Sequence, residues 1–257
     1  MKPFKLAQIT DLHLLQPQGG DYRGVDTRQR LLTLLPELQA WQPDLLVLTG
    51  DLAQDEAAAT YTWLVEQLNA SGLRWTWVPG NHDAPALMQA HHPVSWQHML
   101  HGGWQLLGLN THWPGQVAGR LSADQWSLLN QALQTAEPLI IALHHPPCAV
   151  GTEWIDALRL DQGEAVWQAL TAANKPILLL AGHVHQAIER QVGQVHLFTC
   201  PASSVQFAVG ASQFALDLQA SAGYRQVLLH PNGQWYTQVV RCPAPDTESD
   251  AWREWNV

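Results

Sequence analysis

Short apolar runs recur along the chain, and five of them end abruptly in a cluster of polar residues. The runs cover residues 4–9, 45–48, 75–78, 139–143 and 177–181. Apolar runs of four to eight residues bounded by polar or turn residues are typical of β-strands. The pattern therefore predicts five strands, each followed directly by a turn that carries polar side chains.

Between the first three runs, apolar positions recur at helical spacing. Asp26 or Thr27 can cap a helix to about residue 40, in which leucines at 31, 34, 35 and 38 share one face. A second helix is predicted to begin at Asp55 and Glu56, because acidic side chains suit the start of the helix dipole. The first half of the chain therefore predicts the order β-α-β-α-β.

The second half predicts two more helices and a group of late strands. Ser122 opens a capping box for a helix to about residue 135, and another helix is expected near 163–173. From residue 186 onward, short runs lack helical spacing and predict antiparallel strands joined by turns. These runs cover residues 195–199, 214–218, 225–230 and 235–240. Two packed sheets flanked by helices would use all of these pieces.

Length and composition indicate one globular unit. A chain of 257 residues with 46% apolar residues can build a single α/β core. We expect residues 1–241 to form one domain, with residues 242–257 as a polar C-terminal tail. The net charge of −9 argues against broad nucleic-acid binding. The oligomeric state is left open, with a dimer as one option.

Several features favour a cytoplasmic protein. The longest apolar run, at 138–143, is far shorter than the roughly 20 residues of a membrane span. The N-terminus enters a strand by Phe4 without the apolar segment of a signal peptide, so export is not expected. Three widely spaced cysteines form no CxxC pair, which is typical of reduced thiols in a cytosol.

The polar clusters after the five strands are rich in metal-binding residue types. They are Asp11-Leu12-His13, Gly50-Asp51, Gly80-Asn81-His82-Asp83, His144-His145 and Gly182-His183-Val184-His185. Open α/β sheets bind their ligands beyond the carboxyl ends of the strands. Five strands would therefore bring Asp, His and Asn side chains to one rim, which is what a two-metal site needs.

The residue types restrict the metal. A mixture of carboxylate, amide and imidazole ligands without cysteine favours Fe or Mn, with Zn or Co as alternatives, over Mg alone or a structural zinc. Two ions roughly 3.5–4 Å apart can share a bridging carboxylate, and Asp51 has the two oxygens that this requires. The glycines before Asp51, Asn81 and His183 fit tight turns that a side chain would crowd.

The order and composition of these motifs closely resemble the calcineurin-like metallophosphoesterase superfamily, whose pattern is DxH, GD, GNH[DE], a later His and GHxH. The resemblance implies an α/β fold, a four-layer α-β-β-α sandwich with a dinuclear metal site at the carboxyl ends of the strands. It places the first metal on Asp11, His13, Asp51 and His185. It places the second metal on Asp51, Asn81, His144 and His183. His82 would stay off the metals and protonate the leaving oxygen.

A narrower resemblance covers nearly the whole chain. Residues 24–27, 49–55, 182–186, 201–207 and 223–233 are similar to the bacterial class III 3',5'-cyclic-AMP phosphodiesterases. This implies a small cyclic nucleotide as substrate, hydrolysed to 5'-AMP by a hydroxide that two metals activate, in an enzyme that regulates intracellular cyclic AMP. The residues expected to contact the substrate are His13, Asp51, Asn81, His82 and His185.

Two other functions remain open from the sequence. One is a phosphodiesterase or phosphatase of the same superfamily that acts on a glycerophosphodiester or another nucleotide. The metal ligands cannot exclude it, because they recognise the phosphoryl group and not its substituents. The other is a non-catalytic scaffold on the same fold, against which the complete ligand set argues.

Further residues are weaker candidates. His145 is expected to be a structural partner of a metal ligand. The histidines at 91, 92, 98 and 101 could belong to a lid over the site, in a segment that we expect to be irregular. Arg23 and Arg120 could contact phosphate or adenine. Ser203, Ser204, Gln206 and Phe207 either line a base pocket or form a simple turn.

Overall fold

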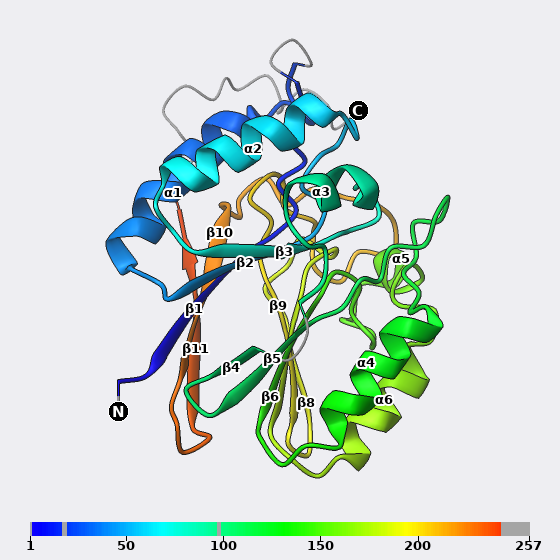
Figure 1. The fold of residues 1–257 in the computed structure, drawn as a ribbon. Coiled ribbons are helices and arrows are strands. Elements are labelled where there is room, and N and C mark those ends of the chain that lie inside the picture. The colour runs from blue at the N-terminus through cyan, green and yellow to red at the C-terminus, as the bar shows by residue number, and fades with distance from the viewer. Residues whose placement is uncertain (1, 17–19, 97–98, 243–257) are drawn as a thin grey trace.

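The computed structural model describes residues 2–16, 20–96 and 99–242, and it contains two mixed β-sheets packed face to face (Figure 1). The five-stranded sheet has the order β11-β10-β1-β2-β3. Its strands are β1 (Phe4–Ile9), β2 (Leu45–Thr49), β3 (Trp75–Val78), β10 (Gly223–Leu229) and β11 (Trp235–Arg241). β1, β2 and β3 run parallel, whereas β10 is antiparallel to both β1 and β11.

The six-stranded sheet has the order β4-β5-β6-β7-β9-β8. Its strands are β4 (Met99–His101), β5 (Trp104–Gly108), β6 (Leu139–Leu143), β7 (Ile177–Ala181), β8 (Glu189–Val192) and β9 (Val195–Thr199). The four inner strands are parallel, and antiparallel strands β4 and β8 form the two edges. Both sheets therefore contribute parallel strands whose carboxyl ends can meet at one rim.

Helices cover the outer face of each sheet. α1 (Thr27–Trp41), α2 (Ala58–Ala70) and α3 (Pro85–His91) pack on the five-stranded sheet. α4 (Ala123–Leu133) and α6 (Gly163–Ala172) pack on the six-stranded sheet, and the short α5 (Glu153–Asp156) lies near the carboxyl ends of its strands (Figure 1). The predicted α-β-β-α sandwich is confirmed.

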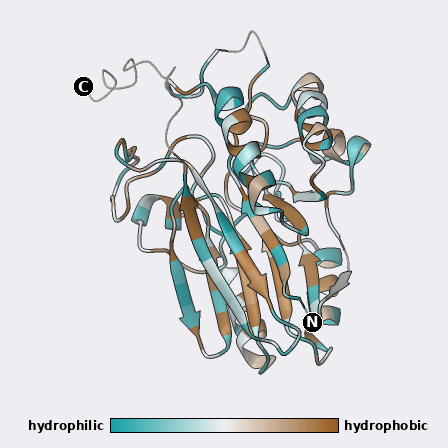
Figure 2. Cartoon of the chain, turned by 90° about the vertical axis from the view of Figure 1, so that its left-hand side faces the viewer, coloured by the Kyte–Doolittle hydropathy of each residue, from teal (hydrophilic) through white to brown (hydrophobic). Residues whose placement is uncertain are grey.

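Three clusters of apolar side chains fill the spaces between the four layers of helices and sheets. One lies between the helices and the five-stranded sheet, one between the two sheets, and one between the six-stranded sheet and its helices. In β6, Leu139 and Ile141 face α4 and α6, while Ile140 and Ala142 face the other sheet. Because the central strands are buried on both faces, their sequences are continuous apolar runs, visible as brown strands in Figure 2.

The predicted strands agree closely with the structure, but several local expectations were wrong. The second helix begins at Ala58, because Glu56 has a left-handed φ of 49° and the Asp55 side chain accepts a hydrogen bond from Ala57 N. Residues 214–218 form no strand; they contribute only a bridge between Phe207 and Leu216. His91 ends helix α3 and so does not lie in an irregular segment.

Two expectations concern residues that the structure does not describe in full. His98 lies outside the described residues, and of His101 only the backbone is placed. Residues 243–257 of the predicted tail also lie outside them. Among the described helices, none combines the length and the apolar character needed to cross a membrane.

Candidate metal centre

The predicted ligands lie at the carboxyl ends of strands from both sheets, and backbone hydrogen bonds hold their loops together. Asp11 N donates to Gly50 O and His13 N donates to Asp51 O, each at 2.9 Å. The two sheets are joined at this rim because His144 Nδ1 donates to the Thr49 carbonyl at 2.7 Å. The topology thus brings together side chains that are up to 174 positions apart, from Asp11 to His185.

Most of these ligand positions have an unusual backbone. Left-handed φ angles between 46° and 70° occur at five of them: Asp11, His13, Asp51, His183 and His185. Positive φ is uncommon for residues other than glycine, although Asp and His tolerate it better than most. Such conformations cost roughly 1–3 kcal/mol each and cluster at functional sites. The surrounding hydrogen bonds therefore keep these turns in a form that aims the side chains inward.

Glycine is required at two of the turns for reasons of space. A Cβ on Gly80 would lie 2.2 Å from Asp51 Oδ1. A Cβ on Gly50, whose φ is +91°, would lie 2.6 Å from His144 Nδ1. Asp51 and His144 can therefore occupy their positions only because these two residues lack a side chain.

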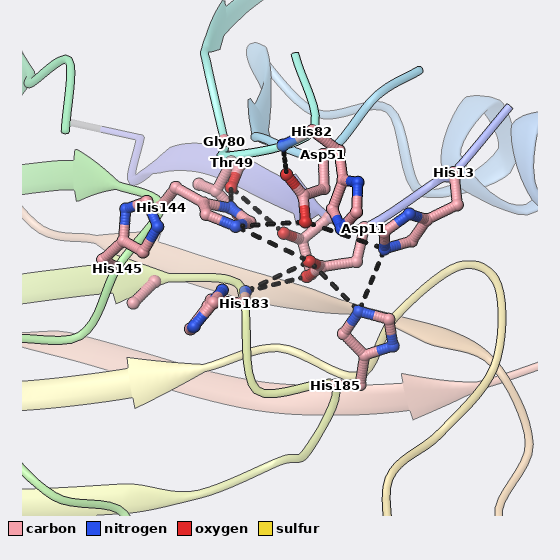
Figure 3. Close-up of polar contacts among 12 residues, drawn as sticks. Asp11, His13, Thr49, Asp51, Gly80, His82, His144, His145, His183 and His185 are labelled. Atoms are coloured by element: carbon pink, nitrogen blue, oxygen red, sulfur yellow. Dashed lines mark hydrogen bonds and ion pairs between the residues drawn. The ribbon is translucent and has the colours of Figure 1, made fainter. Parts of the chain in front are cut away.

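The imidazole and carboxylate groups converge on one point (Figure 3). His185 Nε2 lies 3.3 Å from Asp11 Oδ1 and 3.2 Å from His13 Nε2. Asp51 Oδ2 lies 3.7 Å from His13 Nε2 and 3.4 Å from His144 Nε2. One Asp51 oxygen therefore stands between a histidine of the first predicted ligand set and a histidine of the second.

Three of the histidines have one nitrogen already engaged. Nδ1 donates to Gln54 Oε1 in His13, to the Thr49 carbonyl in His144, and to the Val205 carbonyl in His185, each at 2.7 Å. A histidine that ligates a metal usually donates its other N–H in this way, which fixes the ring and its tautomer. Nε2 of each ring is consequently left for the shared point.

The buried atoms without partners fit a cation. His144 Nε2, His183 Nε2 and Asn81 Oδ1 are buried and have no hydrogen-bond partner among the described residues. Buried polar atoms of this kind are rare in native proteins unless water or an ion satisfies them. Together with the two buried carboxylates of Asp11 and Asp51, these three atoms form a set of oxygen and nitrogen ligands that suits Fe, Mn, Zn or Co.

The electrostatics of the cluster also favour a positive charge. Burial raises the pKa of Asp51, but the nearby His144 outweighs it and the pKa lies well below its usual range. Burial lowers the pKa of His144, yet Asp51 and Asp11 reverse this and raise it to about 9. Burial lowers the pKa of His13 to about 4 and that of His183 to about 3. Asp51 thus stays ionised beside neutral imidazoles at His13 and His183, while His144 holds a proton that a bound cation would displace.

His82 lies at the edge of this cluster and is half-buried. Its backbone N–H donates to Asp51 Oδ1 at 2.9 Å, and its ring centroid is 5.1 Å from that of His13. A ring nitrogen of His82 also comes within 4.8 Å of ligand atoms of His13 and Asp51. His82 therefore faces the cavity beside the ligands and can reach a group that is held there.

The five residues predicted to contact substrate line one cavity of about 140 Å³. They are His13, Asp51, Asn81, His82 and His185. Phe207, from the predicted base-pocket segment, and Arg23 also line it. Ser204 and Gln206 line a neighbouring hollow, and Ser204 Oγ donates to the Asp11 carbonyl. Arg120 lies apart, 3.9 Å from Asp161.

His145 behaves as a structural residue, with both ring nitrogens engaged. Nδ1 lies 2.7 Å from Thr111 Oγ1, and Nε2 lies 3.0 Å from the Val117 carbonyl. His145 therefore holds the segment between Thr111 and Val117 against the site.

Three neighbours of the ligands were not among the predicted site residues. Tyr22 stacks on His13 with ring centroids 4.4 Å apart. Gln54 holds His13, as described above. Trp154 lines the cavity from α5. Gln54 falls in a segment that carried the narrower resemblance, whereas Tyr22 and Trp154 had no local signal. Phe207, which was a predicted candidate, stacks on His185 with ring centroids 3.9 Å apart.

Asp83 joins two of the ligand loops. Its Oδ1 accepts hydrogen bonds from Leu52 N at 3.0 Å, Ala53 N at 3.1 Å and the Tyr61 hydroxyl at 3.0 Å. Its Oδ2 accepts from Gly80 N at 2.9 Å. Burial and the Asp51 charge raise the pKa of Asp83 to about 6, while the backbone donors act in the opposite direction.

We expect Asp83→Ala to lower the free energy of unfolding by about 3–5 kcal/mol, because it leaves several buried N–H and O–H donors without an acceptor. Chemical denaturation followed by circular dichroism measures the change. The matched control is Asp124→Ala, which removes an exposed carboxylate and should cost no more than about 1 kcal/mol. Equal losses in the two variants would contradict a linking role for Asp83.

Comparison with known proteins places the chain in a family. The sequence profile of the calcineurin-like phosphoesterases matches residues 4–187, which is well over half of the chain. The chain belongs to this family. Its motifs at Asp11, Asp51, Asn81, His144 and His183 all fall inside the matched region.

Curated relatives within the family are similar over nearly their whole length. A 3',5'-cyclic-nucleotide phosphodiesterase of Nostoc sp. is 32% identical, over 94% of this chain and 93% of the relative. The 3',5'-cyclic adenosine monophosphate phosphodiesterase CpdA of Pseudomonas aeruginosa is 34% identical, over 92% and 89%. The Escherichia coli CpdA is 31% identical, over 96% and 94%.

Solved structures support the fold of this calcineurin-like phosphoesterase. A dimetal phosphatase from Danio rerio superposes with a TM-score of 0.70, covering 94% of this chain and 99% of that protein, at 13% identity. A purple acid phosphatase from yellow lupin superposes with a TM-score of 0.55, covering 96% of this chain and 57% of that protein. At such low identity the likeness concerns the fold alone.

Proposed function

We propose that this protein hydrolyses 3',5'-cyclic AMP to 5'-AMP and thereby lowers the intracellular concentration of the cyclic nucleotide. Relatives named as cyclic-nucleotide phosphodiesterases, similar over about nine-tenths of both chains, support the substrate. The observation that carries the chemistry is the convergence of the motif side chains on one point, with His82 beside it.

We propose that two metal ions occupy the centre. Asp11, His13 and His185 would hold the first ion, and Asn81, His144 and His183 would hold the second, with Asp51 shared between them. The close approach of His185 Nε2 to Asp11 and His13 supports the first set, and the unpartnered buried atoms of Asn81, His144 and His183 support the second. Fe or Mn suits the mixed ligand set best. When bound, two such ions supply positive charge for the phosphoryl oxygens and lower the pKa of water.

The residues of the chain itself account for the rest of the proposed chemistry. His13, Asn81 and His185 border the cavity and would position the cyclic phosphate, whose phosphorus forms a new bond to the oxygen of a water molecule on the side opposite the 3' oxygen. The bond from phosphorus to the 3' oxygen breaks, and the departing oxygen needs a proton. His82 is the residue placed to donate it, because it lines the cavity beside the ligands and is only half-buried.

We also propose that the protein acts in the cytoplasm, where its substrate would be found. The three cysteines are free thiols in the structure. Burial raises the pKa of Cys200 to about 12, so this thiol stays protonated and unreactive. Free thiols are typical of proteins in a reducing compartment.

A substrate panel tests the proposed function. Purified protein with added Mn or Fe is assayed on 3',5'-cyclic AMP, 3',5'-cyclic GMP, 2',3'-cyclic AMP and glycerophosphocholine. We expect cyclic AMP to give 5'-AMP and not 3'-AMP, because the 3' oxygen is the leaving atom beside His82. Rapid turnover of glycerophosphocholine with no product from cyclic AMP would contradict the proposed substrate while leaving the family assignment intact.

A further inference from the structure

Three aromatic side chains form a compact cluster at the cavity beside the proposed metal centre. The rings of Trp154, Phe207 and Phe214 meet edge to face, with centroid separations of 5.1, 5.3 and 5.4 Å. All three line the cavity that contains His82 and the ligand side chains. Phe214 nevertheless remains 44% exposed, so the cluster offers an aromatic surface at the cavity mouth.

This cluster is held in place before any ligand arrives. Asp156 accepts hydrogen bonds from the backbone N–H groups of Gly151 and Thr152, which fixes the turn that carries Trp154. Thr152 Oγ1 in turn donates to Gln186 Oε1 and accepts from Gly210 N. The loop that bears Phe207 and Phe214 is therefore tied to α5 and to the segment that follows His185. Preorganisation of this kind lowers the entropy lost on binding.

Trp154 brings a hydrogen-bond donor just beneath this surface. Its indole Nε1 is buried and has no partner among the described residues. Tryptophan N–H groups usually find a partner when buried, and the phenylalanine rings beside it offer no oxygen or nitrogen acceptor. A ligand with an acceptor atom in its ring plane would satisfy this donor once a small shift of the exposed Phe214 ring uncovers it.

Arg23 adds a flat positive group to the same mouth. Its guanidinium carbon lies 4.4 Å from the centroid of the Phe214 ring, and the exposed side chain also lines the cavity. Arginine planes and aromatic rings both stack on nucleobases. An aromatic cluster alone could attract a quaternary ammonium group. Here such a group is disfavoured, because the positively charged guanidinium of Arg23 already lies over the Phe214 ring.

We infer that Trp154, Phe214 and Arg23 form the subsite for the base of a purine nucleotide. The inference rests on the proposed function and names the residues that recognise the substrate. The purine packs against the Phe214 and Arg23 surface, and the Trp154 N–H donates to a ring nitrogen of the base. Adenine and guanine both offer such acceptors and a larger stacking face than the pyrimidines, so the subsite favours purines without separating the two purines strongly.

The size of the cavity and its surroundings support this placement. A volume of about 140 Å³ is smaller than the roughly 300–1,000 Å³ of pockets that enclose a drug-sized ligand. The phosphate can therefore enter while the base stays at the mouth, where Phe214 and Arg23 are exposed. The groove on the other side of His82 is lined by Glu56, His112 and Gln116, with no Phe, Tyr or Trp among its described residues.

The test compares cyclic AMP with a base-free analogue, methyl riboside 3',5'-cyclic phosphate, which keeps the same phosphate ring. We expect Trp154→Phe and Phe214→Leu each to lower kcat/KM for cyclic AMP by about 10- to 100-fold, mainly through KM. Arg23→Met should cause a loss of the same kind, about tenfold. The base-free analogue should change by less than about twofold in all three variants.

Trp113→Phe is the matched control, because Trp113 also packs against an arginine, Arg120, but lines a different hollow. It should leave both substrates unchanged. Equal losses on cyclic AMP and on the analogue would overturn the inference, since they would mean damage to the phosphate site. Unchanged cyclic AMP kinetics would also overturn it, because the base would then lie elsewhere.

The wild-type protein separates this inference from the proposed function. If it turns over cyclic AMP, the variants test the subsite alone. If it does not, the proposed function fails, and calorimetric binding of 5'-AMP against ribose 5-phosphate tests the subsite directly. Tighter binding of 5'-AMP to wild type that is lost in Trp154→Phe supports the subsite, whereas equal binding of the two ligands overturns it.

Discussion

Replacing Asp51 by Asn should lower kcat/KM for cyclic AMP by at least ~10³-fold, the largest loss that we expect from one isosteric substitution at this site. Loss of a residue that merely supports a metal ligand typically costs 10–100-fold in metal affinity or activity. Asp51 is placed more centrally, because one of its oxygens lies 3.7 Å from His13 Nε2 and 3.4 Å from His144 Nε2. An amide keeps the shape but removes the negative charge between the two ligand sets.

Removing this charge should also weaken metal binding. Elemental analysis of the purified variant should therefore find fewer than two metal ions per chain. The matched control is Asp161→Asn, which neutralises a carboxylate that is 49% exposed and lies away from the cavity. It should retain both metal content and activity. Full metal content together with wild-type turnover in Asp51→Asn would contradict the shared position of this carboxylate.

The second large effect is expected from His82→Ala, which should slow the chemical step by roughly 10²–10⁴-fold, the usual range for general acid catalysis. The metal content should stay unchanged, because His82 borders the cavity and is not needed to complete either ligand set. Bis(4-nitrophenyl) phosphate should lose less activity than cyclic AMP, since its leaving oxygen requires little help from a proton. Single-turnover assays on the two substrates measure the difference.

His91→Ala is a suitable control for this variant, because it removes an exposed histidine at the end of α3. It should leave both activities as in wild type. An equal loss on the two substrates in His82→Ala would rule out a role as the acid for the leaving group. A fall in metal content would instead indicate that His82 is a metal ligand.

The strands and the ligand set could be predicted from the sequence because both leave local patterns. β6 and β7 are buried on both faces, so each is a continuous apolar run that ends at the polar turn. Three strands were not predicted: β4, β5 and β8. β8 is an exposed edge strand with no apolar pattern. Residues 214–218 have strand-like composition, yet Asp217 accepts from Gln219 N and Ala220 N, and those bonds form a turn in place of a ladder.

The wall of the site could not be predicted in the same way, because its residues meet only through the tertiary fold. Trp154 lies in a helix of four residues, and Phe214 lies in a loop more than fifty positions later. Neither has a periodicity or a motif that marks it. The left-handed turns at Asp11 and His183 were also beyond sequence reasoning, since they depend on hydrogen bonds between loops of different strands.

Anomalous diffraction from crystals of the metal-loaded protein, measured at the Fe and Mn absorption edges, tests the central claim most directly. We expect two peaks, one contacted by Asp11, His13 and His185, the other by Asn81, His144 and His183, with the Asp51 carboxylate contacting both. A single tetrahedral ion, or ions that lie away from Asp51, would contradict it.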